Sequence, residues 1–147
     1  MPKQYPTNIK EVIILAIPNC ATMALVMMNL NMWIYGAWTW EHAIKSFPII
    51  YCTAFALDFF FAGPLVNAIA KKYNLYKYMI FMRVFLMAGT LTFLAPIIES
   101  GYAPTFSHYI TALPRNYIIA LATQALLAFP FGMYVLGLYR LHLNKNN

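Results

Sequence analysis

The sequence predicts an all-α integral membrane protein with four transmembrane helices, and two observations lead to that prediction. Of the 147 residues, 62% are hydrophobic and only 10% are charged, whereas a soluble domain carries about 25% charged residues. Four apolar stretches are also long enough to cross a bilayer, which needs about 20 residues per helix. These stretches are Val12–Ile34, Ala43–Ala70, Tyr78–Ile98 and Tyr117–Leu141.

Basic residues predict the orientation of these helices. If the four spans alternate in direction, seven Lys and Arg residues fall on one side of the membrane and two on the other. Connections rich in Lys and Arg stay in the cytoplasm, so both the N- and C-termini are expected there. The net charge of +6 thus reports topology, and no nucleic acid is expected as a partner, because the charge is scattered over short connections. The seven residues are Lys3, Lys10, Lys71, Lys72, Lys77, Arg140 and Lys145.

The chain also contains an internal repeat. A shift of 66 residues aligns Ala37–Tyr73 with Ala103–Tyr139 without a gap, and eleven of those 37 positions are identical. Shared alanines carry little weight in membrane helices, but two shared prolines and a shared histidine at one offset indicate duplication. We therefore predict two two-helix repeats, residues 1–74 and 75–147, in one compact domain. Because each repeat holds an even number of helices, the repeats should be parallel and related by a pseudo-twofold axis along the membrane normal.

Prolines define the expected bounds of the two longer spans. One helix over Ala43–Ala70 would be about 42 Å long, against a hydrocarbon core of about 30 Å. Proline suits the first turn of a helix, so the spanning helices are expected to begin at Pro48 and Pro114. The preceding segments, Trp40–Phe47 and Phe106–Leu113, would then lie in the outer interface. The second shared pair lies well inside the spans and should kink them: Pro64 and Pro130.

Each two-helix unit has an aromatic interfacial lead-in and a second helix that carries Ala-Phe-Pro or a variant of it. This order resembles a bacterial family of small two-helix membrane domains, often in tandem, that is known only as a domain of unknown function. Gly63 and the Asp58/Gln124 difference depart from the pattern. The resemblance implies a four-helix fold in a bacterial cytoplasmic membrane and brings no activity with it. It rests on Trp40, Phe47-Pro48 and Ala62-Gly63-Pro64 in the first unit, and on Phe106, Ala112, Asn116 and Ala128-Phe129-Pro130 in the second.

Polar side chains inside the apolar spans are the candidate functional residues. A carboxylate at membrane depth costs roughly 2.5–3.5 kcal/mol unless it faces a partner, a cavity or water, and Asp58 stands alone in such a run. Gln124 occupies the corresponding place in the second repeat, and alanines flank both residues at helical spacing. Two interpretations stay open: the pair holds the two halves together, or it lines a polar pathway or ligand site. We predict that Asp58 is required and that its protonation is coupled to activity.

Three further residues belong to the expected inner half of this pathway. Arg83 lies near the cytoplasmic end of the third span, where it either extends to the inner interface or pairs with Asp58. Asn19 and Asn67 lie in the same half. With Arg83 they would form a polar inner vestibule.

The outer entrance is assigned to His42, His108 and Arg115. The two histidines are related by the repeat, which suggests a paired site, and Arg115 is expected to extend to the interface. Two histidines without a third His, a Cys or an Asp nearby fall short of a typical zinc site. We therefore expect no metal and no cofactor. The sequence also lacks catalytic motifs such as HExxH or a phosphate-binding loop, so no enzyme is expected.

Two functions compete on these observations. The first is a transporter or channel-like protein for a small solute or ion, working as a homo-oligomer such as a homodimer, because four helices barely enclose a pathway. The alternative is a non-transporting membrane partner, such as an assembly subunit or immunity-type protein, whose aromatic faces bind another membrane protein. In either case the lipid bilayer is the surrounding partner.

Overall fold

Four long helices make up the fold in the computed structural model, which describes residue 6 and residues 8–145. Each of the four is long and apolar enough to cross a membrane, so the chain is a multi-pass membrane protein. The first and third are the single helices α1 (Ile9–Ile34) and α4 (Met79–Ser100). The second and fourth are composite: α2 (Trp40–Ala56), η1 (Leu57–Ala62) and α3 (Gly63–Tyr73), then α5 (Phe106–Thr123), η3 (Gln124–Ala128) and α6 (Phe129–Lys145). A 3-10 turn, η2 (Tyr76–Tyr78), joins α3 to α4.

The two composite helices begin earlier than the prolines predict. Thr39 and Thr105 cap them, because each hydroxyl oxygen accepts a hydrogen bond from a backbone N–H three residues on, at 3.2 Å and 3.4 Å. The helices then continue through Pro48 and Pro114 without a break. The prediction that they start at these prolines is therefore wrong. A threonine side chain that satisfies a free N–H is the stronger start signal, and a proline inside a helix removes a single backbone donor.

The second pair of prolines acts through a wider turn. η1 and η3 are π-helical segments, and each ends two residues before a proline, Pro64 or Pro130. A proline ring clashes with the carbonyl one turn earlier in an α-helix. A π-helical turn relieves that clash by shifting the hydrogen bond to the residue five positions back, as Gly63 N–H does with the Asp58 carbonyl.

Small residues form the contacts between helices. α1 packs against α2 and also against α6 and η3, while α4 packs against α5 and also against α2, η1 and α3. Each single helix thus touches both composite helices. The alanines that flank Asp58 and Gln124 are almost fully enclosed, as close helix packing in lipid requires: Ala54, Ala62, Ala120 and Ala128 are 0–2% exposed.

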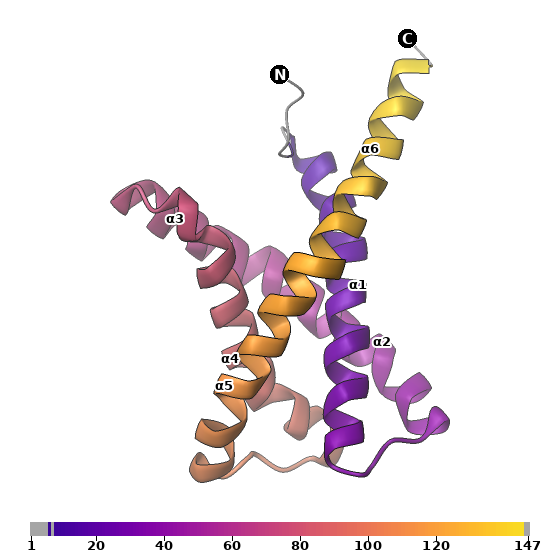
Figure 1. Ribbon diagram of the computed structural model, residues 1–147, viewed down its shortest axis with the longest axis vertical. Coiled ribbons are helices and arrows are strands. Elements are labelled where there is room, and N and C mark those ends of the chain that lie inside the picture. The colour runs from indigo at the N-terminus through magenta and orange to yellow at the C-terminus, as the bar shows by residue number, and fades with distance from the viewer. Residues whose placement is uncertain (1–5, 7, 146–147) are drawn as a thin grey trace.

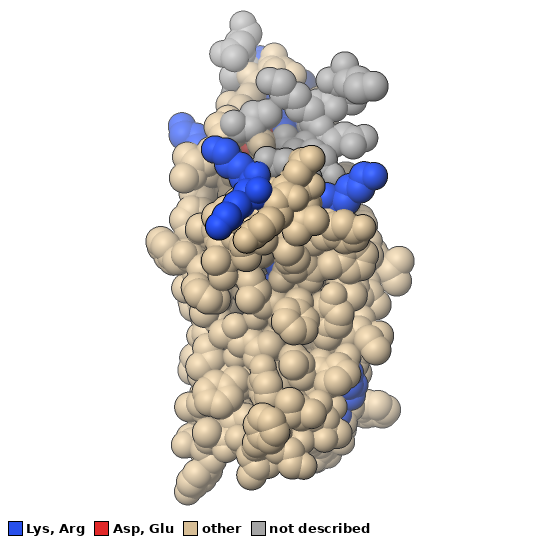
Figure 2. Space-filling view, turned by 90° about the vertical axis from the view of Figure 1, so that its left-hand side faces the viewer, with Lys and Arg blue, Asp and Glu red and all other residues tan. Residues whose placement is uncertain are grey.

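Charge is concentrated at the ends of the molecule. The start of α1, the end of α6 and the turn between α3 and α4 lie at the same end (Figure 1). On one face, Lys and Arg side chains gather at that end, above a broad band of uncharged side chains (Figure 2). This is the distribution that a membrane-spanning bundle requires. Lys3, one of the residues used to predict orientation, lies outside the described residues.

Candidate functional site

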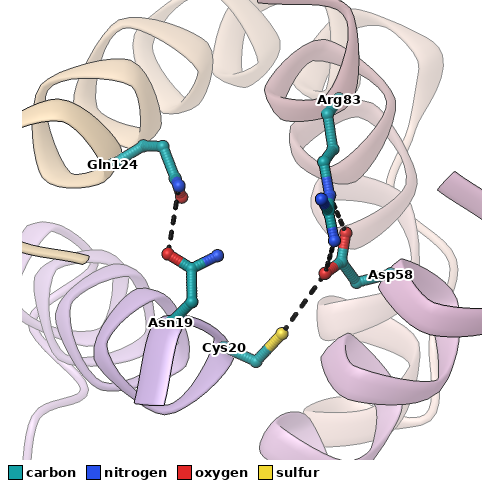
Figure 3. Close-up of polar contacts among 5 residues, drawn as sticks. All are labelled: Asn19, Cys20, Asp58, Arg83 and Gln124. Carbon is teal, nitrogen blue, oxygen red and sulfur yellow. Dashed lines mark hydrogen bonds and ion pairs between the residues drawn. The ribbon is translucent and has the colours of Figure 1, made fainter. Parts of the chain in front are cut away.

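Asp58 is held by three donors from two neighbouring helices (Figure 3). From α4, Arg83 Nε donates to Asp58 Oδ1 at 2.5 Å, and Arg83 Nη2 donates to Oδ2. From α1, the Cys20 thiol lies 3.7 Å from Oδ2. A buried carboxylate is tolerated only when a counter-charge and hydrogen bonds replace its water. Of the two alternatives that the sequence left open for Arg83, the structure shows the pairing with Asp58.

The two members of this ion pair differ in exposure. The Asp58 side chain is 4% exposed, whereas the Arg83 side chain is 40% exposed. Both residues line the cavity described below. The arginine is thus the more accessible member of the pair.

Gly63 explains why the first composite helix can carry this pair. A Cβ atom at position 63 would lie 2.8 Å from the Asp58 carbonyl oxygen and 3.9 Å from Arg83 Nη2. A larger residue there would press on the Asp58 carbonyl and approach the Arg83 guanidinium. The second composite helix forms the same turn with Phe129 at the corresponding position, where the Phe129 N–H bonds to the Gln124 carbonyl. Gly63, which departs from the pattern of the resembled family, thus leaves space beside Arg83 rather than making the turn possible.

Gln124 makes a separate, uncharged contact. Its Nε2 donates to Asn19 Oδ1 on α1 at 3.0 Å (Figure 3). Asp58 and Gln124 make no hydrogen bond with each other in the described part of the chain. If they hold the two halves together, they do so through other residues. Each residue instead connects its composite helix to α1 or α4. Asp58 contacts both α4 and α1, and Gln124 contacts α1. All four spans therefore contribute polar side chains to one region.

A cavity of about 980 Å³ runs through the interior beside these contacts. All five residues of the expected inner pathway line it, as do both histidines of the expected entrance. The polar lining continues from one end of the molecule to the other. It includes Asn67 and Lys77 toward the α3–α4 turn, Asn19, Asp58, Arg83 and Gln124 between the ends, and His42, Glu99 and His108 toward the far end.

The far end of the cavity is organised around Tyr35, at the end of α1. The Tyr35 hydroxyl lies 3.0 Å from His108 Nε2 and accepts a hydrogen bond from Arg115 Nη2 at 3.1 Å. Arg115 also donates to Asn31 at 3.3 Å. Arg115 of α5 is thus bonded to the end of α1; that it extends to the interface stays a prediction. Tyr35 brings His108 and Arg115 together, and within the described residues His42 makes no hydrogen bond with either.

Two polar contacts between helices were not predicted from the sequence. Glu11 is 6% exposed, and Arg140 from α6 donates to both of its carboxylate oxygens, at 3.0 Å and 2.9 Å. Asn116 donates to the Thr92 hydroxyl at 3.0 Å, and both side chains are buried. The available signal for the first pair was a carboxylate directly before an apolar run. No periodic signal would have found the second.

The described residues contain no group of three or more His, Cys, Asp or Glu side chains that could hold a metal ion. Comparisons of the chain with protein-family models, with curated proteins and with solved structures give no match.

Proposed function

We propose that this protein conducts a small solute or ion across a bacterial cytoplasmic membrane, as a homo-oligomer. The observation that carries the proposal is the cavity of about 980 Å³ with polar lining from all four spans. Polar groups at membrane depth are costly and are kept where they face a partner or water.

The Asp58–Arg83 pair is the proposed gate of this pathway. Both residues line the cavity, and the Arg83 side chain is 40% exposed whereas that of Asp58 is 4% exposed. Protonation of Asp58 would remove the charge that holds the guanidinium, because the pair depends on attraction between opposite charges. Arg83 would then be free to turn toward the cavity. Proton binding is therefore coupled to the movement of Arg83.

The two halves are proposed to be parallel repeats, with both termini in the cytoplasm. The shared threonine caps and the π-helical turns before Pro64 and Pro130 support this duplication. The basic residues at the end of the molecule that holds the start of α1 and the end of α6 support the orientation. The resemblance to tandem two-helix membrane domains agrees with this plan and remains a prediction.

The test uses purified protein in lipid vesicles that contain a pH-sensitive dye, with imposed gradients of protons, Na⁺, K⁺ or Cl⁻. Asp58→Asn keeps the shape of the side chain but removes the titrating proton. We expect the parent to show pH-dependent flux and the folded Asp58→Asn protein to lose that pH dependence. Glu41→Gln is the matched control, because Glu41 pairs with Lys45 on the exposed surface. Unaltered pH-dependent flux in Asp58→Asn would contradict the proposal that the Asp58–Arg83 pair is a gate.

A second function is favoured by a different observation. Asp58 is 3% exposed and all its contacts are internal, which suits a protein that packs against another membrane protein without conducting anything. Purification from native membranes separates the two proposals. A stoichiometric second protein, together with vesicles that show no flux for any ion tested, would favour the binding partner.

A further inference from the structure

Among the described residues, Arg115 forms no ion pair with a carboxylate. The chain has four acidic side chains, and three of them each form an ion pair with a different Lys or Arg. Glu11 pairs with Arg140, Glu41 with Lys45 and Asp58 with Arg83, while the electrostatic partner of Glu99 is His42. Among the described residues, Arg115 donates only to neutral acceptors, on Asn31, Tyr35 and Asn116.

The neutral contacts fix the guanidinium in place without neutralising it. Nε and Nη2 make every hydrogen bond of this side chain in the described structure, so Nη1 has no protein acceptor. The acceptor on Asn116 is itself held, because the buried Asn116 amide donates to Thr92. The Tyr35 ring also lies against the guanidinium, with 5.4 Å between Arg115 Cζ and the ring centroid. A cation held in this way is pre-organised for a ligand.

The surroundings of Arg115 favour negative charge. Its partners Tyr35, Asn31 and Asn116 line the cavity, as does His108, whose Nε2 lies 3.0 Å from the Tyr35 hydroxyl. Arg115 itself is not a lining residue of the cavity and lies behind these partners. A planar guanidinium recognises a carboxylate or phosphate group through parallel N–H donors. An uncompensated charge in a partly buried position is unfavourable, and a bound anion relieves it.

We propose that Arg115, with Tyr35 and His108, binds a small anion that carries a carboxylate or phosphate group beside this end of the cavity. The anion comes either from solution or from the headgroup of an anionic lipid. This site does not depend on the proposed function. If the cavity conducts, the site makes anions the first solutes to examine.

The experiment measures binding to the full-length protein, so that its failure is separate from failure of the flux assay. In one arm, inorganic phosphate and then acetate are titrated at constant ionic strength in an uncharged detergent, with thermal unfolding as the readout. In the other arm, native mass spectrometry measures how much phosphatidylglycerol the protein retains relative to phosphatidylcholine. The arm that responds identifies the source of the anion.

Three variants decide the outcome. Arg115→Gln should weaken binding in the responding arm by about tenfold, the loss expected for a charge-assisted hydrogen bond. Lys45→Gln removes the same charge at the same end of the molecule from an exposed ion pair and should change binding less than about twofold. If Arg115→Gln does not fold, Arg115→Lys serves instead, because it keeps the charge and loses the planar fork, so binding should weaken severalfold.

Equal binding by the parent and the folded Arg115 variant would overturn the site. So would an equal loss in Lys45→Gln, because that result would mean a general attraction of anions to positive charge. An absence of binding by the parent in both arms would overturn it as well.

Discussion

The two composite helices share one backbone plan and differ in the chemistry they place at its centre. In both, a threonine caps the start, a proline lies within the first segment, and a π-helical turn precedes a second proline. In the first, that turn presents Asp58, which forms an ion pair with Arg83. In the second, it presents Gln124, which forms a neutral bond with Asn19. The comparison shows that the same π-helical turn presents a polar side chain in both composite helices. That side chain is charged only in the first, at Asp58.

Removal of Arg83 should have the largest effect of any change to this pair of helices. Arg83→Gln leaves the buried Asp58 carboxylate without its counter-charge, which costs about 3 kcal/mol of unfolding free energy. Gln124→Leu removes only a neutral contact and should cost about 1 kcal/mol. Unfolding of both purified variants in mixed detergent micelles measures the difference. Equal losses would mean that the ion pair has no special role in the first helix.

Gly63→Ala should have the next largest effect, because the added Cβ would lie 2.8 Å from the Asp58 carbonyl oxygen. We expect a loss of about 2 kcal/mol, as for an overpacked core position. Gly137→Ala is the matched control in the second composite helix, since no atom lies within 4 Å of its added Cβ. That change should be neutral or stabilise by about 0.5 kcal/mol, because alanine favours the helix. If Gly63→Ala is as stable as the control, the turn has room that the structure does not show.

The sequence predicted the spans well because their signal is local. A run of apolar residues identifies a membrane helix wherever its neighbours lie. Three of the four predicted spans fall inside an observed helix, and the remaining one, Tyr78–Ile98, begins one residue before α4. Their bounds were less accurate at Trp40 and Phe106, because the proline signal was preferred to the threonine cap. The repeat, the orientation in the membrane and the oligomeric state remain predictions.

The sequence predicted which residues belong to the candidate site, but it did not predict most of the contacts between them. Asp58 could be found because a lone carboxylate in an apolar run needs compensation, and Arg83 was the nearest basic residue in another span. Its second neighbour, Cys20, could not be found, because a cysteine in a span is most often a packing residue. The role of Tyr35 was also hidden, since it depends on how the end of α1 meets α5.

The accessibility of the cavity to water tests the central claim most directly. In a background where Cys20 and Cys52, the two free cysteines, are replaced by alanine, single cysteines are introduced at Gln124 and Leu126. Both positions lie in η3, but Gln124 lines the cavity and Leu126 is 74% exposed on the outer surface of the bundle.

A charged, water-soluble methanethiosulfonate reagent reacts with thiolates, which form where water reaches the sulfur. In membranes, we predict that the cysteine at position 124 reacts at least about tenfold faster than the one at position 126. Equally slow reaction at both positions would show that the cavity is dry and would contradict the account of a polar pathway.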